Sequence, residues 1–247
     1  MIIAALLATG LSVGIISTFF GVGGGVIAVP MLYLIFPKIT PQIAISSSMG
    51  MIFINSIINV FNFTHLGQRP KFNLLINMGV GIITGVILGV NLTAYIDGIH
   101  LKLFFSLVLL LVSLKLAFIK SPKPSNDTNW NPQNGLKNRT IEFLVAMSGG
   151  VLAGLTGLGG GAIMVPLFIS VLKMPLKWIP VYSNFLMGCG ALVGITNYMI
   201  LFEKPSFLFD SFIDQFQIGM VNWGIVLMLS AGSLASSRAG VRLFQKT

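Results

Sequence analysis

The chain has 247 residues, of which 55% are hydrophobic and only 9% are charged, and its formal net charge is +9. Ordinary soluble domains carry roughly 25% charged residues, so the composition excludes that class and indicates an integral membrane protein. The positive charge does not indicate nucleic-acid binding, because the basic residues lie in short segments between apolar runs and form no continuous basic face.

Apolar runs of about 20 residues, the length of a membrane-spanning helix, follow one another along the chain. The short alternating segments of membrane β-barrels are absent, so the sequence predicts an all-α, polytopic membrane protein. The predicted spans of the first half cover residues 2–20, 22–36, 41–63, 72–96 and 101–119. Those of the second half cover residues 141–157, 158–172, 176–202 and 215–237.

Each half contains the same glycine-rich turn inside apolar sequence. Gly21–Gly25 reads GVGGG, Gly157–Gly161 reads GLGGG, and a proline follows each at the same distance, Pro30 and Pro166. Both turns and both prolines are 136 positions apart. A helix-breaking element repeated in corresponding places of two hydrophobic halves is typical of a transporter that arose by duplication.

A polar stretch with several prolines, residues 121–139, separates the halves. The sequence thus predicts a first membrane repeat over 1–120, a linker over 121–139 and a second repeat over 140–247. With five spans in the first half, the second half enters the membrane from the opposite side, so the repeats are predicted to be inverted. The second repeat lacks a counterpart of the fifth span, so we expect either nine spans or a longer chain.

The charge distribution predicts the orientation. If residues 2–20 and 22–36 cross separately, one face collects most of the basic residues: Arg69, Lys71, Lys120, Lys123, Lys137, Arg139, Lys173, Lys177, Arg238, Arg242 and Lys246. If they instead form one kinked span, this asymmetry weakens. Basic loops stay in the cytoplasm. We therefore expect a multi-pass protein of the cell (plasma or inner) membrane with its N-terminus outside and its linker in the cytoplasm.

The duplicated G-x-G-G-G-x-x-x-x-P element resembles that of the TauE/SafE family of membrane transporters, the sulfite exporter group. Residues 44–48 and 181–185 are similar to the start of the third helix of each repeat in that family, and residues 65–68 to the turn after it. This resemblance implies passive or proton-linked movement of small anions such as sulfite or sulfonates. The sequence departs from the family pattern at Ser46-Ser47, at Val181-Tyr182 and in the absent last helix.

The glycine turns also predict where a substrate is held. A helix that begins after such a turn presents free N–H groups and a positive dipole end. No Arg or Lys lies at the centre of a span, so an anion would be bound by backbone amides with hydroxyl and amide side chains. The predicted substrate-binding residues are Gly23, Gly24, Gly25, Ser47, Ser48, Gly159, Gly160, Gly161, Ser183 and Asn184, with Asn55, Asn59 and Asn197 farther along.

A purely structural role is the alternative for these residues. Small residues let membrane helices approach closely, which is the role predicted for Gly81, Gly85 and Gly89, and serine side chains can cap or bridge helices. No metal site is predicted, because the two histidines, His65 and His100, are about 35 residues apart at loop edges.

The sequence thus predicts an exporter of small anions that works by alternating access around a midplane site between the repeats. A membrane assembly subunit without transport is one alternative. An intramembrane enzyme is another, but it would need a nucleophile with its base, or a metal cluster, at membrane depth. We predict no catalytic residue and no cofactor. The expected partners are a small anion and the lipid bilayer, with no nucleic acid, and the choice between monomer and homodimer stays open.

Overall fold

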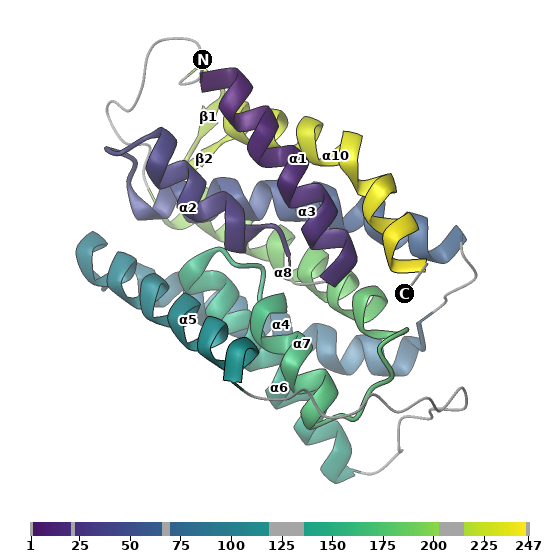
Figure 1. The fold of residues 1–247 in the computed structure, drawn as a ribbon. Coiled ribbons are helices and arrows are strands. Elements are labelled where there is room, and N and C mark those ends of the chain that lie inside the picture. The colour runs from purple at the N-terminus through teal and green to yellow at the C-terminus, as the bar shows by residue number, and fades with distance from the viewer. Residues whose placement is uncertain (1, 21–22, 66–69, 119–135, 203–214, 246–247) are drawn as a thin grey trace.

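A computed structural model describes residues 2–20, 23–65, 70–118, 136–202 and 215–245. These residues form helices and one short hairpin (Figure 1). The helices are α1 (Ile2–Phe20), α2 (Gly25–Ile35), α3 (Pro41–His65), α4 (Phe72–Thr93), α5 (Gly98–Phe118), α6 (Leu136–Thr156), α7 (Gly161–Ser170), α8 (Ile179–Leu201) and α10 (Trp223–Gln245). The strands β1 (Gln217–Ile218) and β2 (Val221–Asn222) pair in an antiparallel hairpin.

Two of the predicted boundaries are wrong. The span expected from residue 215 begins as the β1–β2 hairpin, whose turn contains Gly219 with a φ of 57°. The helix starts only at Trp223, because the Asn222 side-chain oxygen accepts a hydrogen bond from the Ile225 N–H (3.1 Å) and caps its first turn. In addition, α6 begins at Leu136, so the last four residues of the expected linker are helical. Residues 121–135 lie outside the described part of the chain.

Within the described ranges, three helices, α3, α4 and α8, are long and apolar enough to cross a membrane, judged by length and composition. Shorter apolar helical segments also occur, over Ile2–Ser17, Gly25–Ile35, Gly98–Leu111, Gly161–Ser170 and Trp223–Ser237. Large apolar side chains on the outside of the bundle are widely exposed, among them Leu34 (74%), Phe72 (73%) and Ile200 (81%). Such a surface suits contact with lipid, so the fold agrees with a membrane location.

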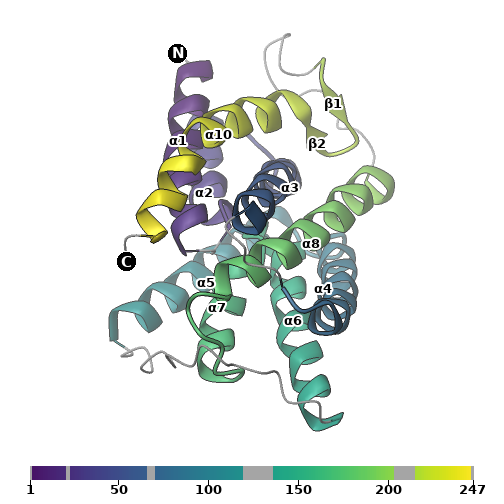
Figure 2. The ribbon, with the colours of Figure 1, turned by 90° about the vertical axis from the view of Figure 1, so that its right-hand side faces the viewer.

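The helices pack in two units that do not coincide with the two halves of the sequence (Figures 1 and 2). The first unit contains α1, α2 and α3 together with α10 from the second half. The second unit contains α6, α7 and α8 together with α4 from the first half. Each half thus contributes its fourth helix to the other unit.

Equivalent helix contacts recur in the two units. A Cβ on Gly10 of α1 would lie 3.0 Å from the Gly232 Cα of α10. In the other unit, a Cβ on Gly81 of α4 would lie 3.2 Å from the Cβ of Ala146, the residue 136 positions after Gly10. Since a Cβ at Gly81, Gly85 or Gly89 would run into α6 backbone, the predicted packing role of these glycines is confirmed.

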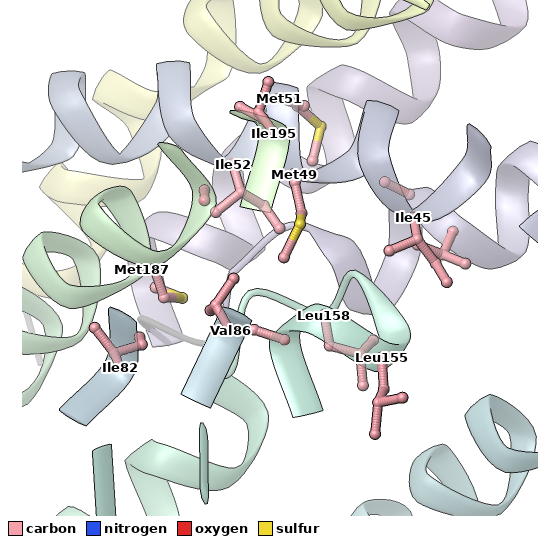
Figure 3. Close-up of a cluster of buried hydrophobic side chains, with 14 of the residues drawn as sticks. Ile45, Met49, Met51, Ile52, Ile82, Val86, Leu155, Leu158, Met187 and Ile195 are labelled. Atoms are coloured by element: carbon pink, nitrogen blue, oxygen red, sulfur yellow. The ribbon is translucent and has the colours of Figure 1, made fainter. Parts of the chain in front are cut away.

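The two units meet mainly where α3 packs on α8. These helices run antiparallel: Asn59 donates to Asn184, Ser56 lies against Gly188, and Gly194 lies against Met49. Figure 3 shows the buried apolar cluster at this contact, to which α3, α4, α8 and the residues before α7 contribute side chains. The contact places repeat-equivalent helices face to face at the centre of the molecule.

Candidate functional site

The two glycine turns lie against each other where the two units meet. A Cβ on Gly23 would lie 2.9 Å from the Leu158 carbonyl oxygen and 3.8 Å from the Gly159 Cα. A Cβ on Gly25 would overlap the Gly157 carbonyl oxygen and lie 2.7 Å from the Leu158 Cα. The prediction that the turns approach one another is confirmed. This approach is close enough that neither Gly23 nor Gly25 has room for a side chain.

The backbone of the turns also requires glycine. In the second turn, Gly157, Gly159 and Gly160 have φ angles of 69°, 77° and 75°, and Gly23 in the first turn has a φ of 83°. Residues with a Cβ are strained in this left-handed region, whereas glycine is not. Residues 21–22 of the first turn lie outside the described part of the chain. The repeated G-x-G-G-G pattern thus encodes both a backbone geometry and a close approach.

Each glycine turn leads directly into a helix N-terminus. Helix α2 begins at Gly25 and α7 at Gly161, and the N-cap residues are Gly24 and Gly160. No described side chain caps either helix, and all four of these glycines are buried. The first N–H groups of a helix have no acceptor within the helix, and its positive dipole end favours an anion. The contact therefore supplies positive potential without a cationic side chain.

The surroundings of the turns are apolar. A Cβ on Gly24 would lie 2.6 Å from the Met51 Cε, and one on Gly23 would lie 2.8 Å from the Met187 Sδ. Met51 and Met187 are 136 positions apart, and both are almost completely buried in the cluster of Figure 3. Electrostatic attraction is stronger in such a low-dielectric setting than in water, and methionine side chains adapt readily to a change of shape.

Among the described residues, Ser48 is the polar residue predicted at the start of α3 that reaches a glycine turn. Its hydroxyl donates to the Gly157 carbonyl oxygen (2.9 Å). The Ser47 hydroxyl oxygen instead accepts from the Asn222 N–H (3.2 Å) at the start of α10. Both serines are completely buried. Ser48 is therefore beside the turn contact, whereas Ser47 ties α3 to α10.

The polar residues predicted on α8 bond mainly within their own unit. The Ser183 hydroxyl donates to the Pro180 carbonyl oxygen (3.3 Å), as does Asn184 Nδ2 (2.7 Å). Asn184 Oδ1 accepts from Asn59 Nδ2 (2.9 Å) and so links the two units. Ser47 and Ser183 are not brought together. They lie towards opposite ends of the antiparallel α3–α8 contact, because only residues near its centre meet their repeat equivalents.

Three polar residues of α10 and its N-cap were not predicted: Asn222, Ser230 and Ser233. The Ser233 hydroxyl donates to Asn55 Oδ1 of α3 (2.7 Å). The spacing of Ser230 and Ser233, one helical turn apart in an apolar segment, is a sequence signal that could have identified them. Within the described residues, no three His, Cys, Asp or Glu side chains gather in a group that could bind a metal.

The chain matches the family model described as Sulfite exporter TauE/SafE over residues 6–247. It is 28% identical over 238 residues to a probable membrane transporter protein of Haemophilus influenzae, and the aligned region covers 96% of this chain and 85% of that protein. It is 24% identical over 259 residues to the probable membrane transporter protein YunE of Bacillus subtilis, covering 98% of this chain and 88% of that protein. No solved structure matches the chain.

Proposed function

Because the chain belongs to the sulfite exporter TauE/SafE family of membrane transporters, which are not enzymes, we propose that it exports small anions, with sulfite and sulfonates as substrates. The observation that carries this proposal is the contact between two buried glycine turns, each of which leads into a helix whose N-cap is a glycine without a capping side chain. A buried anion without compensation costs many kcal/mol. Two N-termini supply that compensation and leave the anion free to depart.

The proposed substrate site has a centre and two flanks. The centre consists of Gly23–Gly25, Gly159–Gly161 and Ser48, whose hydroxyl lies beside the second turn. Ser183 and Asn184 form one flank, and Ser47 forms the other. Each flank would add hydrogen bonds as the anion moves away from the N-termini, at about 1.5–3 kcal/mol for a charged acceptor.

We further propose that the repeats are inverted and that transport proceeds by alternating access. In support, α3 and α8 occupy equivalent places in the two repeats and run antiparallel. The contacts of α1 with α10 also correspond to those of α6 with α4. Rocking of one unit against the other about the α3–α8 contact would expose the turns first to one side and then to the other.

The proposed topology, with the N-terminus outside and the linker in the cytoplasm, requires that residues 2–20 and 22–36 cross the membrane separately, and the helix directions support this requirement. Helix α10 runs parallel to α1, since Leu11 and Leu7 lie beside Ser236 and Gly232, and also parallel to α3. Helices α1 and α3 are therefore parallel to each other, so the chain turns back between them through α2. This return agrees with separate segments rather than one kinked span.

Flux measurements on the reconstituted protein test the proposed substrate class. Vesicles would be loaded with sulfite, sulfate, sulfoacetate or acetate, with and without a pH gradient, and protein-free vesicles would serve as the reference. We expect sulfite or sulfoacetate efflux above that reference. Efflux of none of the four anions would contradict the proposal.

Substitution of the turns separates a transporter from an assembly subunit. Gly24→Leu or Gly160→Leu is expected to abolish efflux, because neither turn has room for a leucine. A Cβ at Gly24 would run into the Val13 and Met51 side chains, and one at Gly160 would run into the Gly149 backbone of α6. The control is Gly79→Leu on α4, since a Cβ at Gly79 has no neighbour within 4 Å. If the leucine variants fail to fold, Gly24→Ala replaces them, because Gly24 has a helical φ of −73°. Normal efflux in a folded variant would exclude the turns from the site.

A further inference from the structure

A second polar cluster lies inside the first unit, between α3 and α10. It consists of Asn55 (5% exposed), Ser230 (1%) and Ser233 (1%), and we name it the Asn55 cluster. The Ser233 hydroxyl donates to Asn55 Oδ1 at 2.7 Å. This bond engages the side-chain oxygen of Asn55 and leaves its amide nitrogen for another partner.

Two groups of the Asn55 cluster are buried and have no hydrogen-bond partner among the described residues: Asn55 Nδ2 and Ser230 Oγ. Ser230 precedes Ser233 by one turn of α10, so their Cβ atoms are about 5–6 Å apart. Both groups therefore lie within reach of one small ligand. Leaving such groups unpaired in a membrane interior is costly, so a partner that accepts hydrogen bonds would stabilise this arrangement.

The equivalent place in the second unit shows that packing does not require these polar groups. Asn55 corresponds to Ala191 at the 136-residue offset. The fourth helices, α4 and α10, are related by a different offset. A Cβ on Gly232 would meet the Leu7 carbonyl oxygen, and a Cβ on Gly81 would meet the carbonyl oxygen of the repeat equivalent, Phe143. Gly81 and Gly232 are therefore equivalent, and the offset between α4 and α10 is 151 residues. At that offset, Ser230 corresponds to Gly79 and Ser233 to Ile82. Ile82 packs on Gly190 of α8, whereas no atom lies within 4 Å of a Cβ at Gly79. The three corresponding positions of the second unit thus carry no polar side chain.

We propose that Asn55 and Ser230 form a second binding station for the transported oxyanion, beside the glycine turns. The station rests on the proposed function and deepens it. Asn55 Nδ2 offers two N–H donors and Ser230 one O–H donor, and an oxyanion supplies only acceptors. Ile52, whose side chain would lie 3.0 Å from a Cβ on Gly159, is one turn before Asn55 on α3. An anion leaving the turns therefore reaches this station within about one helical turn.

Ser233 acts as a positioning residue at this station. By donating to Asn55 Oδ1, it holds the side-chain carbonyl away from an incoming anion, which that oxygen would repel, and leaves the N–H groups available. Only one of the two units has this station, so the path on one side of the turns differs from the path on the other. The two directions of movement would then meet different binding sites.

The test compares Ser230→Ala with the matched control Ser237→Ala in α10. The Ser237 hydroxyl is also buried but bonds to the Leu234 carbonyl oxygen of its own helix (3.1 Å). We expect Ser230→Ala to raise the KM for sulfite or sulfoacetate efflux about tenfold, the loss of one hydrogen bond to a charged acceptor. Its melting temperature should not fall, because the removed hydroxyl has no protein partner. The control should keep the wild-type KM.

Ser233→Ala and Ser233→Thr test the positioning role. Ser233→Ala is expected to raise KM about as much as Ser230→Ala, and Ser233→Thr, which keeps the hydroxyl, should restore it. A wild-type KM in Ser230→Ala overturns the station but not the proposed function. If Ser230→Ala has the wild-type KM but a lowered melting temperature, the Asn55 cluster binds a structural water instead of the anion.

A binding measurement keeps the station testable even if no efflux is seen. Sulfite would be added to the purified protein in detergent, with chloride at matched ionic strength as the reference. A sulfite-induced rise of melting temperature in the wild type that is reduced in Ser230→Ala supports the station. The same rise in both proteins overturns the station alone. No rise in the wild type, together with no efflux, overturns both the station and the proposed function.

Discussion

Gly157→Ala tests whether the glycine turn is held in one conformation by its neighbours. Gly157 has a φ of 69°, and a left-handed alanine costs about 1–2 kcal/mol. The added Cβ would also lie 2.9 Å from the Ile45 Cα and 3.0 Å from its carbonyl oxygen, both backbone atoms of α3. Overpacking of this kind costs about 1–3 kcal/mol. We therefore expect a loss of about 2–5 kcal/mol in the free energy of unfolding.

The matched control for this prediction is Gly79→Ala in α4. No atom lies within 4 Å of a Cβ at Gly79, and alanine is favoured over glycine in a helix by about 0.5–1 kcal/mol. Thermal unfolding in detergent would measure both variants. At roughly 2–4 °C per kcal/mol, Gly157→Ala should melt at least about 4 °C below the wild type, whereas Gly79→Ala should melt no lower. Melting of both variants at the wild-type temperature would refute the reasoning.

Three further predictions follow from the site, the topology and the packing. Ser183→Ala is expected to weaken anion affinity about ten- to a hundredfold, and wild-type affinity in a Ser47→Ala/Ser183→Ala double variant would remove both serines from the site. A cysteine at position 129, with Cys189 replaced, should resist an impermeant thiol reagent added to intact cells; labelling there would contradict a cytoplasmic linker. Tyr198→Phe should lower the unfolding free energy by about 1–3 kcal/mol, because the buried hydroxyl donates to a backbone carbonyl oxygen of α6 at 2.8 Å; an unchanged melting temperature would contradict this.

The sequence was sufficient to predict the helical elements, because they depend on local composition. It was also sufficient to predict the contact between the glycine turns, because the same pattern occurs in corresponding places of the two halves. The 136-residue offset relates α1, α2 and α3 to α6, α7 and α8. It fails for the fourth helices, where Gly81 and Gly232 are 151 positions apart. The order of the spans nevertheless makes residues 215–237 the counterpart of residues 72–96, and extra residues before α10 account for the larger offset. The exchange of these helices between units could not be predicted, because it depends on packing between distant segments.

The glycines of the candidate site could be predicted from the sequence, because backbone geometry requires them. The contacts of its polar residues could be predicted less well, because they depend on the direction in which each side chain projects. Glycine at positions 23, 157, 159 and 160 follows from positive φ angles. By contrast, Ser47 and Ser48 are adjacent in sequence but project in directions about 100° apart around the helix. One therefore bonds to α10 and the other to the second turn. Equal repeat offsets could not reveal this difference.

The exchange of α4 and α10 has a consequence for how the site could open. Because each half of the chain has helices in both units, relative movement of the units must be accommodated by the connections to α4 and α10. The main contact between the units is α3 on α8, with the glycine turns beside it. The glycines of the turns meet through backbone atoms, and Met51 and Met187 beside them can change rotamer. The contact between the turns thus combines close backbone approach with adaptable neighbours, as the proposed alternating access requires.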